Sequence, residues 1–236
     1  MSHYSLGLTS RDRVNHAFGG GLPSGAIVLL QGPDGSGKSV WTQRMAYGLA
    51  EEGTTVGVTS TDLTASDFLE QMHSISYGVT DHLLSDRIRF FHADVQAHPD
   101  LLDRLLTPSP LWRRDVVIVD GFGALCRNDA GFAAATSRGR EDRAMGAAVS
   151  TLRTAAATGT VVVVTVNPGF VSEDALQPLR GAADVLLELR TKPVGNELRR
   201  EALVRRFAGM KAPVDDTIGF AVQQGRGVVI ESRTIA

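Results

Sequence analysis

The sequence has 236 residues, of which 43% are hydrophobic and 21% charged, and these values are typical of one folded domain and exclude a disordered or fibrous chain. Its net charge of -2 provides no general attraction to nucleic acid or anionic lipid, and its single cysteine, Cys126, excludes an internal disulfide and favours a reducing, cytosolic setting. Apolar runs such as 161–164 are far shorter than the ~20 residues of a membrane-spanning helix, and residues 1–16 lack the apolar core of a signal peptide, so we expect membrane contact only through partners.

Short apolar runs alternate with helical patterns along the first two thirds of the chain. The apolar runs predict buried strands at 26–31, 54–60, 87–93, 115–120 and 160–166. The patterns between them predict helices at 38–53, 64–76, near 99–107 and at about 140–158. Continuous apolar strands separated by helices are typical of a parallel sheet that is covered on both faces, so the fold class is α/β.

The last third of the chain has a different pattern. Apolar runs at 183–190, 200–209, 218–224 and 227–232 follow one another without a helix between them, and residues 223–227 have the composition of a hairpin turn. We therefore expect an antiparallel C-terminal extension of the parallel core. Two stretches look irregular, the Ala/Gly-rich 126–140 and the proline-containing 167–181, and both follow strand ends, where ligand and partner loops usually lie. No repeat or linker is visible, so residues 1–236 are expected to form one domain.

Residues 32–39, GPDGSGKS, match the pattern G-x-x-x-x-G-K-[ST] between a predicted strand and a predicted helix. Glycines allow successive backbone N–H groups to turn inward, and these groups with the helix N-terminus attract phosphate charge. The predicted nucleotide-binding residues are Gly32, Pro33, Asp34, Gly35, Ser36, Gly37, Lys38, Ser39 and Val40. In this role Lys38 reaches the β- and γ-phosphates of ATP. The alternative, a chance glycine-rich turn, does not account for both flanking elements.

A magnesium ion normally accompanies the nucleotide at such a loop. The hydroxyl of Ser39 is expected to join the Mg²⁺ shell, and Asp120, at the end of the predicted strand 115–120, can hold Mg²⁺ through water. Asp120 alone could also be an ordinary turn residue after a buried strand. The phosphate loop favours the metal role.

Three residues at strand ends are candidates for the base that activates water in hydrolysis. Asp62 follows the second strand and is either this base or the N-cap of the next helix, a position for which Thr64 is equally suited. Asn167 could sense the γ-phosphate, but we favour the start of a turn; Glu173 is expected to be only a first-turn charge of a helix. Residues 198–207 are basic along a predicted strand, which indicates a solvated face or a contact with a neighbouring subunit's phosphate rather than nucleic-acid binding.

A family resemblance rests on these motifs and on blocks outside them. The stretch 19–39 with "DVVIVD" resembles the KaiC branch of the RecA-like ATPases. Residues 60–84, the segment "RIRFFHADV" and the C-terminal block from 204 to 233 are more specific, and they are similar to the FlaH (also called ArlH) family of archaellum motor proteins. The resemblance covers nearly the whole chain, and it implies a single RecA-like P-loop NTPase domain.

The resemblance also implies a function, a cofactor and partners. Members of this family bind ATP, can form hexameric rings, and dock at the cytoplasmic side of the archaellum motor beside the membrane platform protein and the motor ATPase. They are viewed as nucleotide-dependent and poor at hydrolysis. The positions that carry over are Lys38 and Ser39 for phosphate and Mg²⁺, and Asp120 as the Walker B acid, so the expected cofactors are ATP and Mg²⁺.

Three positions depart from the family pattern. The family usually has Glu where this chain has Asp62, which is one methylene shorter, and Gly121 after Asp120 offers no hydroxyl. KaiC relatives carry a Lys-x-Arg pair that contacts a neighbour's nucleotide, and here only Arg206 of that pair is present. An arginine supplied across an interface can be worth 10³–10⁵ in rate, so these departures favour slow turnover.

The sequence therefore predicts an ATP-binding, hexameric assembly or regulatory switch of the archaellum motor, cytoplasmic and peripheral at the membrane, with weak or no ATP hydrolysis. One alternative is an active KaiC- or RecA-like ATPase in which Asp62 is the base. Another is a DNA recombinase paralogue that binds single-stranded DNA through the loops 126–140 and 167–181, and we expect no such binding.

Overall fold

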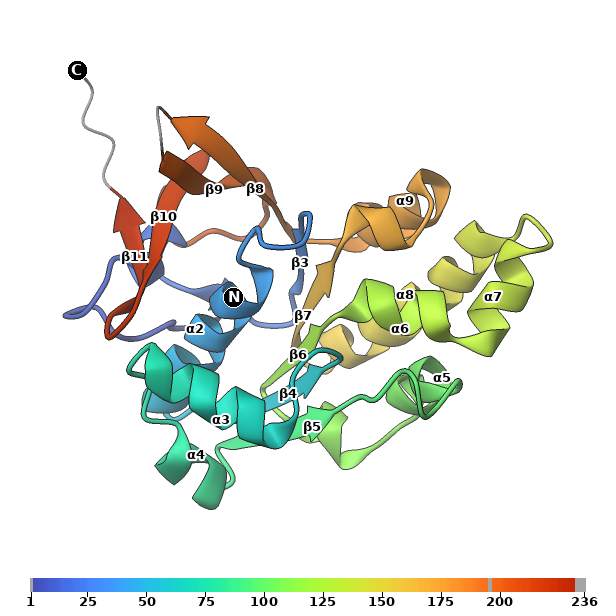
Figure 1. The fold of residues 1–236 in the computed structure, drawn as a ribbon, viewed down its shortest axis with the longest axis horizontal. Coiled ribbons are helices and arrows are strands. Elements are labelled where there is room, and N and C mark those ends of the chain that lie inside the picture. Colours follow the sequence, from blue (N-terminus) through green and yellow to red (C-terminus); the bar gives the residue numbers. More distant parts are fainter. Residues whose placement is uncertain (1, 195–196, 232–236) are drawn as a thin grey trace.

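The computed structural model describes residues 2–194 and 197–231 (Figure 1). Its central feature is a 9-stranded sheet in the order β11-β10-β9-β8-β3-β7-β6-β4-β5. The strands are β3 (Ile27–Gln31), β4 (Val56–Ser60), β5 (Ile88–His92), β6 (Val116–Asp120), β7 (Val161–Val166), β8 (Val185–Val194), β9 (Glu197–Phe207), β10 (Thr217–Gln223) and β11 (Gly227–Glu231). The longer helices are α2 (Lys38–Glu51), α3 (Ala65–Ser74), α8 (Glu141–Ala157) and α9 (Glu173–Ala182).

The strands from β8 to β5 in this order are all parallel to their neighbours, and helices connect them. Each of the five strands predicted from apolar runs is present, with ends that differ from the prediction by two residues at most. Strands β3, β4, β6 and β7 are buried along their whole length, because helices cover both faces of the sheet. The predicted parallel α/β core is therefore confirmed.

Successive residues of each central strand face opposite sides of the sheet and belong to two different cores. Val28 and Leu30 of β3 pack with α2 and α3, in a cluster that includes Trp41 and Phe68. Ile27 and Leu29 of the same strand pack with α8 and α9, in the other cluster. Figure 1 shows α2 and α3 on one side of the sheet and α8 and α9 on the other.

The C-terminal strands β9, β10 and β11 extend the sheet in antiparallel fashion, as the sequence predicts. Gln223 pairs with Gly227, so the predicted hairpin turn is confirmed. The first of the four apolar runs, in β8, differs from the other three because it pairs in parallel with β3 and antiparallel with β9. Strand β8 therefore lies at the boundary between the parallel and the antiparallel part of the sheet. Residue 232, the last of the predicted strand residues, lies outside the described part of the chain.

Two expectations about loops were wrong. The stretch 126–140 holds the end of α6 (Phe122–Asn128) and all of α7 (Ala130–Thr136), and 167–181 holds a 3₁₀ turn (Pro168–Phe170) and most of α9. Alanine has the highest helix propensity, and the side chains of Asp129 and Ser172 cap α7 and α9 by accepting hydrogen bonds from backbone N–H groups. Pro178 lies within α9, since a helix that packs on the sheet tolerates one lost backbone hydrogen bond.

The remaining elements are short. They are α4 (Thr80–Leu84), α5 (Leu101–Leu106), a second 3₁₀ turn (Pro110–Arg113), and, near the N-terminus, α1 (Val14–Ala17) with the paired strands β1 (His3–Tyr4) and β2 (Leu22–Pro23). No helix in the part of the chain that the structure describes is long and apolar enough to cross a bilayer.

Candidate nucleotide-binding site

The phosphate loop lies at the carboxyl end of β3 and leads directly into α2. Gly35 and Gly37 have left-handed backbone conformations, with φ of 75° and 98°, which residues with a Cβ adopt only at a cost. A Cβ on Gly35 would meet nothing within 4 Å, so this side of the loop is open. Gly37 is the N-cap of α2, and the helix therefore begins with backbone N–H groups directed at the loop.

The ammonium group of Lys38 is hydrogen-bonded to the backbone of the phosphate loop. Its Nζ donates hydrogen bonds to the carbonyl oxygens of Gly32 and Pro33, both at 2.8 Å. Burial lowers the pKa of Lys38, and the carboxylates of Asp34, Asp120 and Asp62 act in the opposite direction. The three carboxylates are therefore near enough to affect the lysine, and the sequence prediction that this loop, Asp62 and Asp120 form one site is consistent with the geometry.

Asp120 ends β6 and is 6% exposed. Thr165 of β7 donates a hydrogen bond from Oγ1 to Oδ1 of Asp120 at 2.7 Å, and Ser39 lines the same cavity as this carboxyl group. Burial raises the pKa of Asp120, and the nearby hydroxyl groups of Thr165 and Ser39 lower it in part. Thr165 also accepts a hydrogen bond from the N–H of Gly121 at 2.8 Å, so one threonine fixes both the acid and the turn after it.

These residues fit a magnesium ion bound together with a nucleotide. A hydroxyl and a carboxylate are oxygen ligands of the kind that Mg²⁺ prefers, and they lie side by side at the open face of the loop. No group of three or more His, Cys, Asp or Glu residues that could hold a metal occurs within the described residues. Ser39 and Asp120 would thus hold the ion with help from phosphate oxygens and water, as is usual beside such a loop.

Asp62 and Asn167 follow the ends of β4 and β7, and both line the cavity beside the loop. The N-cap of α3 is Thr64, which forms a capping box with Asp67, so Asp62 is not the cap; its carboxylate accepts a hydrogen bond from Thr61 Oγ1 at 3.1 Å. Whether it serves as a base stays a prediction. Asn167 does start the turn, because its Oδ1 accepts from the N–H of Gly169, and its Nδ2 also donates to Asp34 of the phosphate loop at 2.8 Å. Glu173, as expected, lies in the first turn of α9.

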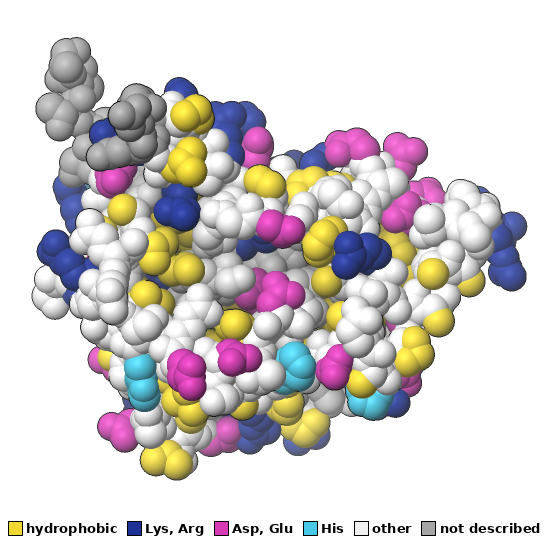
Figure 2. Space-filling view, in the orientation of Figure 1, with side chains coloured by type: hydrophobic (Ala, Val, Ile, Leu, Met, Phe, Trp, Pro, Cys, Tyr) yellow, Lys and Arg dark blue, Asp and Glu magenta, His cyan; other side chains and the backbone are white. Residues whose placement is uncertain are grey.

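Most of these groups line one cavity of about 370 Å³, a volume in the range of small-molecule sites, but Glu173 and the predicted loop residues Gly32, Pro33 and Ser36 do not. Its walls are the phosphate loop and the carboxyl ends of β4, β6 and β7, with Arg200 of β9 and Val222 of β10 closing another side. On the face drawn in Figure 2, basic and acidic side chains lie close together around a central hollow. Ligands of parallel α/β sheets bind at this edge of the sheet.

Three polar residues of the cavity were not predicted: Thr61, Thr165 and Arg200. Thr165 had a faint signal, since it is the one polar residue in the run "VVVVTV". Arg200 belongs to the basic stretch 198–207, which indicated a solvated face or a contact with a neighbouring subunit's phosphate; nothing in the sequence placed it at the phosphate loop of its own chain. Arg206, predicted to contact a neighbour's nucleotide, does not line this cavity; its Nη1 donates to the carbonyl oxygens of Arg180 and Ala183 at 2.9 and 2.7 Å. Its role toward a neighbour stays a prediction.

Comparisons with known proteins agree with this geometry. A family model described as "ATPase: KaiC" matches residues 11–103. The chain is 28% identical over 232 residues to the archaeal flagellar ATP-binding protein FlaH of Methanocaldococcus jannaschii, with 96% of this chain and 95% of the relative covered. It is 26% identical over 231 residues to the protein of the same name from Methanococcus voltae, with 96% of each chain covered. The resemblance to FlaH is confirmed.

Solved structures support the same conclusion. The crystal structure of the flagellar accessory protein FlaH from M. jannaschii superposes with a TM-score of 0.88 at 26% identity, over 98% of this chain and 100% of that one. The KaiC-like protein of Pyrococcus horikoshii has a TM-score of 0.73 over 98% and 99% of the two chains, and at 18% identity it supports the fold alone. The predicted RecA-like, KaiC-type α/β fold is thereby confirmed.

Proposed function

We propose that this chain is the ATP-binding RecA-like subunit of an archaellum motor, and that bound Mg·ATP controls its assembly or its docking to partners. The observation that carries this proposal is the arrangement of Lys38, Ser39 and Asp120 around one open phosphate loop, in a chain similar to FlaH along nearly its whole length. We expect cytoplasmic hexamers that meet the membrane only through the platform protein and the motor ATPase.

Several features favour a switch with slow or no hydrolysis over an active ATPase. Asp62, the candidate base in the alternative of an active ATPase, is an exposed aspartate that already accepts a hydrogen bond from Thr61. The guanidinium of Arg206 donates hydrogen bonds to backbone carbonyl groups of its own chain, so it is already engaged before any contact with a neighbour's nucleotide. Ligand binding alone is enough for a switch, because ATP at a hundred times its Kd stabilises the binding-competent state by about 2.7 kcal/mol.

The test compares the wild type with Lys38→Ala by calorimetry with Mg·ATP and by sedimentation. We expect the substitution to abolish both ATP binding and ATP-dependent assembly, because it removes the ammonium from the loop. Lys211→Ala is the matched control, since Lys211 is exposed and outside the cavity. Wild-type protein that does not bind Mg·ATP would refute the proposal.

Two further measurements separate the alternatives. Phosphate release at on the order of 1 s⁻¹ that disappears in Asp62→Asn would favour the active ATPase. A shift of single-stranded DNA at physiological salt would favour the recombinase paralogue. The structure favours neither DNA loop, because Arg127, from the first predicted loop, lies 3.9 Å over the ring of Phe170, from the second.

A further inference from the structure

The β8–β9 hairpin passes over the phosphate loop. Gln31, the last residue of β3, pairs with Glu188 of β8, whereas Arg200 of β9 pairs with Thr191, three residues further along β8. The two strands therefore continue beyond the end of β3, over the loop that follows it. The contact is close, since a Cβ on Gly32 would lie 2.3 Å from the carbonyl oxygen of Leu189.

Arg200 is held above the loop by its cross-strand neighbour. It pairs with Phe220 of β10, which is 1% exposed and packs edge-on against Trp41 of α2 with 5.3 Å between ring centroids. The Phe220 ring lies 3.0 Å from where a Cβ of Gly37 would be, and Cδ of Arg200 lies 3.6 Å from the same point. The Nε of Arg200 donates a long hydrogen bond, 3.4 Å, to the carbonyl oxygen of Gly35.

The charge of Arg200 is not neutralised within the described part of the chain. Three of the other four arginines of the hairpin are engaged: Arg190 pairs with Glu201, Arg205 pairs with Glu188, and Arg206 donates to backbone carbonyl groups. Arg199 is also without an ion pair among the described residues, but unlike Arg200 it does not line the cavity. Among the described residues Arg200 makes no ion pair, and its hydrogen bond to Gly35 uses only one of its five N–H donors.

A second cationic side chain, in addition to Lys38 and the expected Mg²⁺, suits the charge of this cavity. Its lining includes three carboxylates, Asp34, Asp62 and Asp120, and these repel the phosphates of a nucleotide. Lys38 and Arg200 are the two cationic residues that line it. A guanidinium suits this place, because its fork of N–H donors matches phosphate oxygens better than a second ammonium would.

We infer that Arg200 binds the phosphate chain of the nucleotide held by its own chain. This inference rests on the proposed binding of ATP. It assigns a phosphate contact to the antiparallel extension, at a residue outside the phosphate loop and distinct from Arg206, whose predicted contact is with a neighbour's nucleotide. The bound nucleotide then contacts two separate parts of the fold. It contacts α2 through the phosphate loop, and it contacts the β8–β9 hairpin through Arg200.

The test is the affinity for Mg·ATP of Arg200→Ala, measured by calorimetry at a protein concentration at which sedimentation shows monomers. Arg199→Ala is the matched control, because Arg199 is the adjacent arginine of β9, is exposed, makes no ion pair among the described residues and lies on the other face of the strand. We expect Arg200→Ala to weaken binding about 10- to 100-fold, the range for one charge-assisted contact, and Arg199→Ala to leave it within about twofold.

Two further readouts separate a phosphate contact from a merely structural role. Arg200→Lys should recover part of the lost affinity, and Arg200→Ala should make the affinity less dependent on salt, whereas thermal unfolding without nucleotide should match that of Arg199→Ala. Equal affinities of the two alanine variants, or a loss confined to oligomers, would overturn the inference while leaving ATP binding intact. Wild-type protein without ATP affinity would instead refute the proposed function itself.

Discussion

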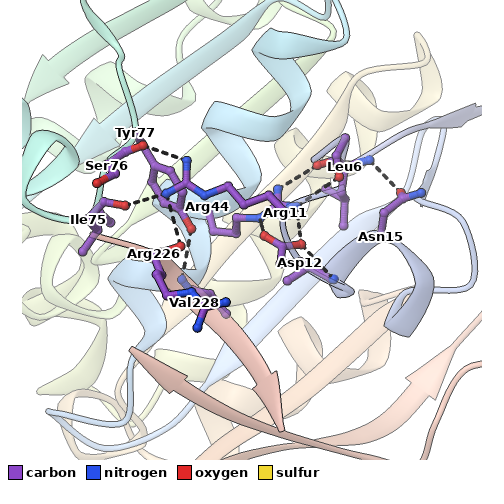
Figure 3. A network of polar contacts seen from close by, with 12 residues as sticks. Leu6, Arg11, Asp12, Asn15, Arg44, Ile75, Ser76, Tyr77, Arg226 and Val228 are labelled. Atoms are coloured by element: carbon purple, nitrogen blue, oxygen red, sulfur yellow. Dashed lines mark hydrogen bonds and ion pairs between the residues drawn. The ribbon is translucent and has the colours of Figure 1, made fainter. Parts of the chain in front are cut away.

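A buried ion pair joins the N-terminal segment to the helix that follows the phosphate loop (Figure 3). The Arg44 guanidinium of α2 donates to both carboxylate oxygens of Asp12, from Nε at 2.6 Å and from Nη2 at 2.8 Å. It also donates to the carbonyl oxygens of Leu6 and Gly7 at 2.7 and 3.1 Å. The side chains of Arg44 and Asp12 are 0% and 1% exposed, so water contributes almost nothing to either charge.

We predict that Asp12→Ala strongly destabilises the protein. The change leaves the Arg44 charge buried and without a counter-ion, and breaking one side of a buried pair typically costs about 3–5 kcal/mol. A domain of this size loses roughly 2–4 °C in Tm for each kcal/mol, so Tm should fall by about 6–20 °C. That loss is a large part of the 5–15 kcal/mol that stabilises a typical domain.

The assay is denaturant unfolding without nucleotide, followed by the fluorescence of Trp41, which is fully buried on the same helix as Arg44. Asp100→Ala is the control, since Asp100 forms an exposed pair with Arg104, and it should cost less than about 1 kcal/mol. In the double variant Asp12→Ala/Arg44→Met the buried charge is removed as well, so the loss should be smaller than the sum of the two single losses. A loss below about 1 kcal/mol for Asp12→Ala would refute this account of the pair.

Two other predictions concern the site. Asp120→Asn should stabilise the protein without nucleotide by on the order of 1 kcal/mol while weakening Mg²⁺-dependent ATP binding, as measured by unfolding and by calorimetry with and without EDTA. Because burial raises the pKa of Asp120, its charged form opposes folding above its ordinary pKa, so this gain should be larger at pH 7 than at pH 4; an equal gain would contradict it. Gly37→Ala should lower the stability by about 1–2 kcal/mol and should also weaken ATP binding, because φ of Gly37 is 98° and the added Cβ would lie 3.0 Å from the Phe220 ring. The control Gly146→Ala, within α8, should raise the stability by about 0.5–1 kcal/mol.

The sheet core could be predicted from the sequence because its strands are buried on both faces. Runs such as 116–120 and 161–166 therefore consist almost wholly of β-branched residues, and few other structures need that composition. The stretches 126–140 and 167–181 were misjudged for the opposite reason. Helix α7 begins at a single capping residue, Asp129, whose pattern is weak beside the surrounding Ala and Gly. The start of α9 was expected from Glu173, but Pro178 within it obscured how far the helix extends.

The candidate site could be predicted where a motif or the end of a recognisable strand marks its residues. Gly32 to Ser39 carry their chemistry in one motif, and Asp120 marks the end of a recognisable strand. Thr165 and Arg200 reach the same cavity because β7 pairs with β6 and β9 pairs with β8. Which strands pair cannot be deduced from the spacing of residues along the chain.

The antiparallel extension takes part in the site because it packs on the helix that starts there. Phe18, Trp41 and Phe220 form a chain of ring contacts at 5.4 and 5.3 Å from α1 through α2 to β10, and the Phe220 ring also contacts Gly37. Such a dense core has little room to adjust. The proposed nucleotide would therefore lie against the antiparallel extension, and any shift of the α2 N-terminus on binding would have to be accommodated by Phe220 of β10 and by β9 beside it. This packing supports the proposal that ATP acts as a switch, because it links the phosphate loop to strands outside the parallel core.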